Sequence, residues 1–269
     1  MNNLPRILSK VFREVWATTP EHHRSLRSAI QSHLEQGGEV TPVKSGVDAS
    51  LEMESTVAVI PLHGTIGKHV SPLERMFGAV DVDEAGAVIA EAAADESIDR
   101  IVLDINSPGG TITGVPELAK TIREATEIKE VIAFTDDLMA SAAYWLGSQT
   151  DAIYSTMSAE VGSVGVYMAL LDESEAMAMD GVKVNAIHSG AFKLAGASFK
   201  PLEDAEREMF QADVEKWHDR FKADVNIRRN VDAQFMEGQT FDGDDAARFG
   251  LTDGVVDSIE DLFALTSAR

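Results

Sequence analysis

The 269-residue chain contains no cysteine, which excludes disulfide bonds, cysteine-ligated zinc and a thiol nucleophile. Basic residues are also scarce, because 23 lysines and arginines stand against 45 aspartates and glutamates, a formal net charge of −22. So acidic a protein repels phosphate backbones and anionic lipid surfaces, and we expect no nucleic-acid partner. Apolar runs such as 164–171 are far shorter than the roughly 20 residues that a membrane span needs, so we expect no such span.

The N-terminal segment differs from the rest of the chain. Charges at Arg6, Lys10 and Arg13 interrupt it, so it lacks the apolar core of a signal peptide, and we expect a cytoplasmic, non-secreted protein. Apolar residues at helical spacing predict helix within residues 1–36, and the polar stretch 36–54, with glycine and proline, predicts a linker. The expected domains are therefore an N-terminal helical arm with its linker, residues 1–54, and a second domain, residues 55–269.

Strand-like and helix-like segments alternate from residue 55 onward. The expected strands are 56–62, 99–106, 130–135, 151–155 and 182–188, and the expected helices are 83–94, 113–124, 141–148, 173–180 and 202–229. Such alternation is typical of an α/β fold in which helices flank a mostly parallel sheet.

Three short stretches contain residues suited to chemistry. The glycine pair in Asn106–Gly110 could point backbone amides at an oxyanion or a phosphate, although a plain tight turn explains it equally well. Ser141, among alanines at an expected helix start, is either a nucleophile or an ordinary helix cap. Lys193, at the end of Ser189–Lys193, is a surface residue by default. It could act as a base only if burial lowered its pKa well below about 10.4.

The seven histidines offer little support for a histidine-dependent triad. Only His63 and His188 follow predicted strands, and we expect both to be structural or surface residues. No HExxH or comparable ligand spacing is present, so we expect no metal site.

Taken together, five segments resemble the SppA-like signal peptide peptidases, a family of serine proteases that share the ClpP/crotonase fold. In chain order the segments are Leu103–Gly110, Ala140–Tyr144, Gly162–Val166, Ser189–Lys193 and Gly238–Gly243. The resemblance extends from about Val57 to Leu262 and implies that a ClpP/crotonase-like fold, with a mostly parallel sheet flanked by helices, follows the arm.

The resemblance also implies the roles of five residues. Ser141 falls on the family's nucleophile, Lys193 on its general base, and Ser163 on a serine that hydrogen-bonds this lysine. The amides of Gly109 and Ala142 fall on the oxyanion hole. The chain has Ser-Ala-Ala where many members have Ser-Gly-Gly, which keeps the side chains small. Lys200 is near enough in sequence to be an alternative base, but it lies in no matching motif. A Ser–Lys dyad needs no metal or organic cofactor.

The opening of the chain has Trp16-Ala17 and Pro20-Glu21 ahead of an expected helix, the linker and the second domain. This opening resembles the phage-encoded branch of the family, the head maturation proteases also called minor capsid protein C. This branch implies scaffold and capsid proteins as substrates, a location in the host cytoplasm or the prohead, and a ring-like homo-oligomer. Three alternatives stay open: a soluble bacterial peptidase of the same family, a non-catalytic capsid-associated protein, and a crotonase-like acyl-CoA enzyme.

Overall fold

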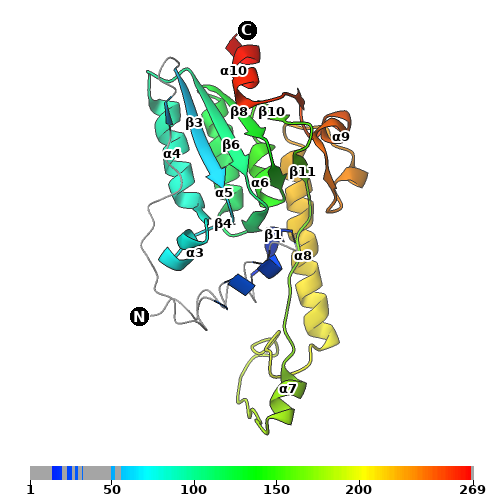
Figure 1. The fold of residues 1–269 in the computed structure, drawn as a ribbon. Coiled ribbons are helices and arrows are strands. Elements are labelled where there is room, and N and C mark those ends of the chain that lie inside the picture. The colour runs from blue at the N-terminus through cyan, green and yellow to red at the C-terminus, as the bar shows by residue number, and fades with distance from the viewer. Residues whose placement is uncertain are drawn as a thin grey trace.

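A mostly parallel sheet forms the centre of the computed structural model, which describes residues 14–19, 23–25, 28–29, 32, 50–51 and 56–267 (Figure 1). Its strands lie in the order β13 (Gly254–Val255), β10 (Ala152–Ser155), β8 (Glu130–Thr135), β6 (Arg100–Asn106), β3 (Val57–His63) and β2 (Ser50–Leu51). Neighbours from β13 to β3 pair in parallel, and only β2 is antiparallel. Runs such as Ile101–Leu103 in β6 are buried on both faces, as parallel strands require.

Helices cover both faces of this sheet. α4 (Val82–Ala94) and α5 (Val115–Thr126) bury alanine, valine and isoleucine side chains in the main core. α10 (Ile259–Ser267) covers the opposite face, where Leu262 packs in a second cluster with Val102, Ile132 and Phe134. The predicted α/β class, with a mostly parallel sheet flanked by helices, is confirmed.

Two smaller sheets extend the strands that lead to the candidate site. One contains β1 (Trp16–Thr18), β7 (Gly109–Thr111), β4 (Ile66–Gly67) and β5 (Val80–Asp81), and the other contains β12 (Thr240–Phe241), β11 (Glu160–Gly162) and β9 (Leu138–Ala140). The remaining helices are α3 (Pro72–Met76), α6 (Ala142–Gly147), α7 (Ser174–Met179), α8 (Asp204–Val225), the short 3-10 helix η1 (Ala233–Phe235) and α9 (Gly243–Arg248). Because β7 follows β6 and β9 follows β8 in the chain, the glycine turn and Ser141 lie near the same end of the main sheet.

The N-terminal arm is not helical throughout. Residues 16–18 form strand β1, which pairs antiparallel with β7 and is fully buried. Burial of Trp16, whose ring stacks on His23 at 4.6 Å, outweighs the helical spacing that the sequence shows there. Residues 23–25, 28–29 and 32 are helical, and most of the remaining arm lies outside the described residues. The domain boundary at residue 54 stays a prediction.

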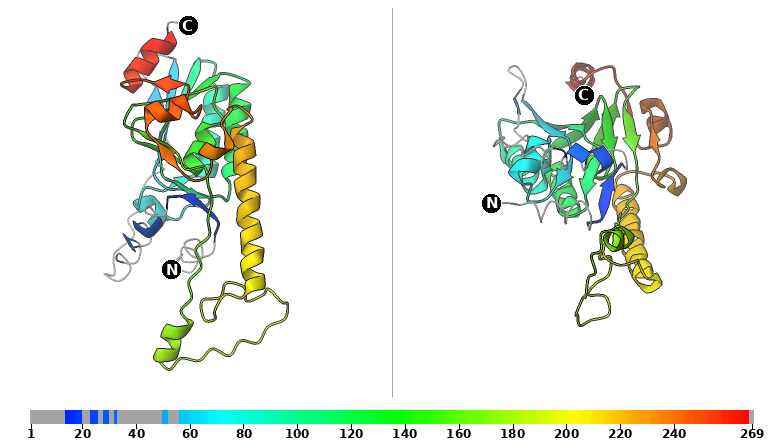
Figure 2. Two further views of the ribbon diagram at one scale, coloured as in Figure 1. Left: turned by 90° about the vertical axis from the view of Figure 1, so that its right-hand side faces the viewer. Right: turned by 60° about the horizontal axis from the view of Figure 1, so that its bottom comes forward.

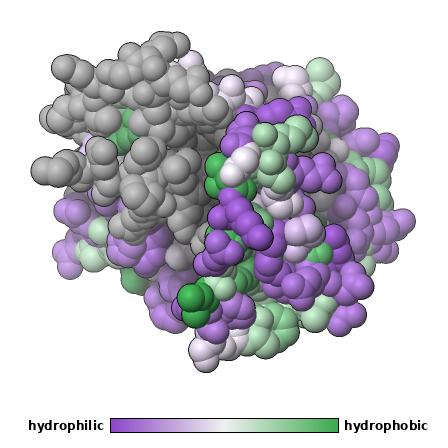
Figure 3. Space-filling view, turned by 90° about the horizontal axis from the view of Figure 1, so that it is seen from below, coloured by the Kyte–Doolittle hydropathy of each residue, from purple (hydrophilic) through white to green (hydrophobic). Residues whose placement is uncertain are grey.

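A long excursion, residues 172–203, leaves the body between β11 and α8. It carries α7 and lies beyond the rest of the molecule, while α8 leads the chain back to the body (Figure 2). The strand expected over 182–188 is wrong, because these residues have no regular structure and all are exposed. Alternating apolar residues form a strand only beside a hydrogen-bonding neighbour, and this segment has none among the described residues. Seen from below, the surface of the molecule mixes hydrophobic residues with hydrophilic ones (Figure 3).

None of the helices in the described part of the chain combines the length and the apolar character that crossing a bilayer requires.

Candidate active site

Ser141 lies at a strained turn between β9 and α6. Its φ of 57° and ψ of −119° fall in a region that non-glycine residues rarely occupy, and such strain concentrates at functional sites. The Ser141 amide donates to the carbonyl of Gly162 at 2.8 Å, and Oγ donates to the carbonyl of Gly165 at 3.3 Å. The residue is fully buried in this state.

The glycine turn passes directly beside this serine. Gly109 has a φ of 93°, and a Cβ at this position would lie 2.9 Å from the backbone nitrogen of Ala142 and 2.1 Å from the carbonyl oxygen of Ala17. Only glycine fits such a close approach. The structure therefore brings together the two residues expected to form the oxyanion hole.

The amide of Gly109 has a partner within its own turn. It donates to Oγ of Ser107 at 3.1 Å, and this hydroxyl donates to the carbonyl of Gly64 at 2.6 Å. An oxyanion would have to replace Ser107 as the acceptor of the Gly109 amide. In this structure the hydrogen bond of the Gly109 amide is therefore made within the turn.

Ser163 directly follows β11, the strand that pairs with β9. β11 and β9 are parallel with Gly162 opposite Ala140, so the two serines follow paired residues. Ser163 also has a positive φ, 51°, and its amide donates to the carbonyl of Gln239 at 2.6 Å. Ser163 therefore lies beside Ser141, while Lys193, its expected hydrogen-bond partner, lies on the excursion.

Aromatic packing holds α6, the helix that follows the serine. Its Trp145 stacks on Phe221 of α8 with ring centroids 4.4 Å apart, and the indole nitrogen donates to the buried carboxylate of Asp224 at 3.1 Å. Tyr144 donates its hydroxyl to the carbonyl of Leu251 at 3.0 Å, and burial raises the pKa of that hydroxyl. The sequence analysis did not predict these contacts. The adjacent aromatic residues Tyr144 and Trp145, close after Ser141, are the sequence feature that could have indicated them.

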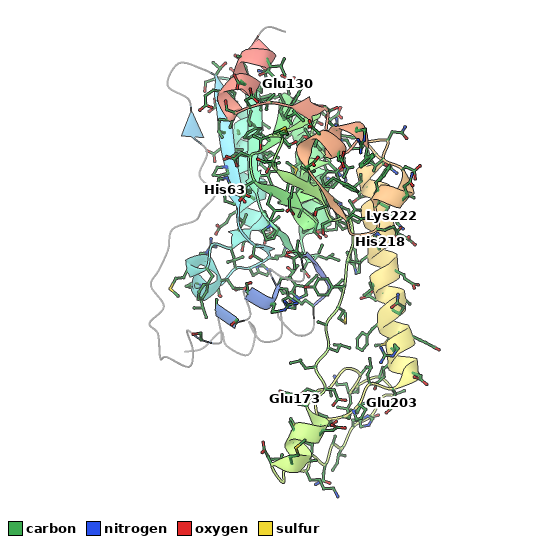
Figure 4. The ribbon with its side chains drawn as sticks, turned by 45° about the vertical axis from the view of Figure 1, so that its right-hand side comes forward. His63, Glu130, Glu173, Glu203, His218 and Lys222 are labelled. Carbon is green, nitrogen blue, oxygen red and sulfur yellow. The ribbon has the colours of Figure 1, made fainter. Side chains whose placement is uncertain are left out.

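Lys193 is not near Ser141 within one chain. It lies on the excursion and is exposed, and the neighbouring Phe192 is half exposed. Glu173 and Glu203, which stand at the two ends of the excursion, lie well away from the body that contains His63 (Figure 4). Among the described residues, no titratable side chain hydrogen-bonds to the Ser141 hydroxyl.

Two other candidate bases, Lys200 and His188, are also accounted for. The amine of Lys200 donates to Glu206 at 2.6 Å and to Glu203 at 3.1 Å, and these carboxylates raise its pKa, so this lysine is held as an ammonium ion. His188 is exposed, with Nδ1 at 3.3 Å from the carbonyl of Gly190. Neither residue is arranged to activate Ser141.

His63 pairs with Asp104 at the end of β3, beside the glycine turn. The ring nitrogen Nε2 lies 2.8 Å from Oδ2 of Asp104. The hydrogen bond to this carboxylate raises the pKa of His63, partial burial opposes the change, and the charge of Asp136 adds to it. His63 is thus a surface ion-pair residue, as expected.

This pair predicts a small pH dependence of stability. Because the pKa of His63 is raised on folding, its contribution is fully present below the unfolded-state pKa of about 6.5 and is lost as pH rises through the folded-state value. We expect His63→Gln to lower the free energy of unfolding more at pH 5.5 than at pH 8.5, by less than about 1 kcal/mol because the pair is exposed. Urea unfolding at both pH values checks this, and equal losses at the two would contradict it.

A model of peptidase family S49 matches residues 123–265, more than half of the chain. The chain belongs to peptidase family S49. The matched region includes Ser141, Ser163 and Lys193, and membership of a peptidase family decides against the crotonase-like acyl-CoA enzyme. Membership agrees with the ClpP/crotonase-like fold that the sequence resemblance implied.

Several known proteins are similar to this chain over much of its length. Capsid assembly protease C of Escherichia phage lambda is 27% identical over 292 residues, covering all of this chain and 66% of the phage protein. Head-tail preconnector protein GP5 of Enterobacteria phage P21 is 27% identical, over 79% of this chain and 43% of its own length. Protease 4 of Haemophilus influenzae is 28% identical, over 74% of this chain and 32% of its own length. The chain therefore spans only part of the length of these relatives.

Among solved structures, an enoyl-CoA hydratase/isomerase family member has a TM-score of 0.45 and 14% identity, over 85% of this chain and 76% of that chain.

Proposed function

We propose that this S49 member is a serine endopeptidase with Ser141 as its nucleophile and that it cleaves scaffold or capsid proteins during phage head maturation. The observation that carries the proposal is the strained turn at Ser141, with the Gly109 turn packed against the amide of Ala142. A serine that only caps a helix needs no positive φ, and here its side chain makes no cap hydrogen bond. The strain therefore favours a catalytic over a purely structural serine.

The arrangement suits acyl transfer. Ser141 Oγ attacks the carbonyl carbon of the scissile peptide bond and gives its proton to the base, and the resulting oxyanion accepts hydrogen bonds from the amides of Ala142 and Gly109. The base then protonates the leaving amine as the carbon–nitrogen bond breaks. Water hydrolyses the acyl-enzyme by the same steps, releases the new carboxylate and restores the serine hydroxyl.

We infer that the base is Lys193 of a neighbouring copy of the chain. Its own Ser141 is out of reach, and the excursion that bears the lysine exposes apolar side chains that a second copy would cover. Among them Met179 is 82% exposed and Ile187 is 101% exposed. Burial against the neighbour would lower the pKa of the amine, and the hydroxyl of Ser163 beside Ser141 would orient it. A homo-oligomer is then a requirement of catalysis.

The phage role is supported by the names of two relatives, a capsid assembly protease and a head-tail preconnector protein. A bacterial housekeeping peptidase is the second candidate, favoured by the similarity to Protease 4.

A fluorophosphonate probe, which phosphonylates activated serines, tests the assignment of the nucleophile. We expect one adduct per chain, located at Ser141 by peptide mass spectrometry. Ser155→Ala is a matched control, because Ser155 is equally buried but lies in a regular strand, and this variant should label like the wild type. Labelling that persists in Ser141→Ala, or that falls on other serines alone, would remove Ser141 from the mechanism.

A further inference from the structure

Strand β1 lies directly on the catalytic turn. It pairs antiparallel with β7, with Trp16 opposite Thr111, Ala17 opposite Gly110 and Thr18 opposite Gly109. The carbonyl oxygen of Ala17 approaches Gly109 so closely that a side chain there is impossible, and the amide of Ala142 contacts the same position. Residues from the N-terminal arm therefore reach the expected oxyanion hole.

The other edge of β1 is bound as well. The Trp16 amide donates to the carbonyl of Tyr167 at 2.8 Å, and the Tyr167 amide donates back at 2.9 Å. Tyr167 comes two residues after Gly165, whose carbonyl accepts the Ser141 hydroxyl. β1 thus fills a slot with main-chain hydrogen-bonding groups on both sides, bounded by β7 and by residues 165–167.

The fit of β1 in this slot is imperfect. The hydroxyls of Thr18 and Thr111 are buried, with the residues 4% and 3% exposed, and neither has a hydrogen-bond partner among the described residues. A buried hydroxyl without a partner weakens binding, because water satisfied it before burial. A strand that gave these hydroxyls hydrogen-bond partners could therefore displace β1 from the slot.

We propose that this slot is the binding site for an extended peptide and that β1 occupies it in cis as an inhibitory strand. Extended peptides bind such edges by adding a strand, with backbone hydrogen bonds giving affinity. The proposal rests on the proposed function of Ser141, and it adds that the substrate binds there as an extended strand. Because Ala17 is fully buried against the glycine turn, the slot accepts a small side chain at that position.

The hydrogen bonding of the glycine turn agrees with a blocked state. With β1 in place, the Gly109 amide donates to Ser107 and not to a peptide carbonyl, so β1 is held without being cleaved. Ser141 is closed off in the same state. A substrate strand must displace β1 before its carbonyl can reach both amides.

A reversible crosslink tests the proposal on the full chain. The native sequence has no cysteine, so Trp16→Cys with Thr111→Cys places one thiol pair on directly opposed residues of the ladder, within disulfide range. The probe is a fluorescein-labelled peptide of residues 14–19 (EVWATT), and its binding is followed by anisotropy in a Ser141→Ala background. We expect the reduced protein to bind it at least about tenfold more tightly than the oxidised protein, because the crosslink keeps the slot filled.

The controls separate this proposal from the proposed function. Each single cysteine variant should be insensitive to oxidation, and circular dichroism checks folding. If the double variant fails to fold, Ala17→Pro, which removes the residue-17 amide donor, is compared with Ala17→Gly, which keeps it. We expect the proline variant to bind the peptide more tightly than the glycine variant.

Equal peptide binding in both redox states, or in both Ala17 variants, would show that β1 is a permanent strand and overturn the proposal. Redox-dependent binding without any cleavage by the Ser141 form would leave the slot in place and refute the peptidase function instead.

Discussion

Replacing Ser141 with alanine is expected to abolish peptide hydrolysis, with a loss in kcat of roughly 10⁴-fold or more, as for other serine nucleophiles. The reason is that the variant has no oxygen to form the acyl-enzyme, while the amides of Ala142 and Gly109 stay in place. Gel-based cleavage of a scaffold protein, or of a fluorogenic peptide with a small residue before the scissile bond, measures the effect.

The fold should survive this substitution. The hydroxyl makes one long hydrogen bond, 3.3 Å to the carbonyl of Gly165, so its removal should cost about 1 kcal/mol of the free energy of unfolding. Thermal unfolding followed by circular dichroism provides the check, with Ser155→Ala as a second serine-to-alanine variant at a buried site. Wild-type turnover by Ser141→Ala would exclude this residue as the nucleophile.

Replacing Lys193 with either alanine or arginine is expected to abolish activity to a similar degree. The base must be neutral before it takes the serine proton, and a guanidinium stays charged at every pH at which the protein is folded. Lys200→Ala should stay active, because Lys200 is tied to Glu203 and Glu206 as an ammonium ion. Profiles of kcat/KM against pH for the four proteins measure this, and wild-type activity should rise with pH because only the neutral amine can act as the base.

Mixing two inactive variants tests where the base comes from. If Lys193 acts on the Ser141 of a neighbouring copy, Ser141→Ala and Lys193→Ala chains refolded or exchanged together should recover activity, to about one quarter of the wild type for random one-to-one assembly. Each variant alone stays inactive and serves as the control. A mixture with no activity, from chains shown to co-assemble, would mean that the lysine acts within its own chain.

Local pattern was sufficient to predict most of the core. The apolar runs at 99–106 and 130–135 are strands β6 and β8, and the alanine-rich segment at 83–94 is α4. These elements were predictable because the spacing of apolar residues along the chain indicates which side chains are buried. The glycine turn and the Ser141 segment were also visible in the sequence, since close backbone approach requires glycine and small neighbours. The strain at Ser141 was not visible, because it depends on the neighbouring strand β11.

The tertiary structure decided what depends on partners far away in the chain. Trp16 has helical spacing to its neighbours, yet it lies in a strand because β7 and Tyr167 supply hydrogen bonds on both sides. Residues 182–188 alternate like a strand, yet they stay irregular because nothing in the described chain pairs with them. Lys193 lies in the motif that the family resemblance requires, but it is far from Ser141 of the same chain. The motif determines which residue is present, whereas the path of the excursion determines how far that residue lies from Ser141. The sequence by itself determined most of the core strands and helices and the residue types of the candidate site, and only the packing of distant segments decided which of these groups meet.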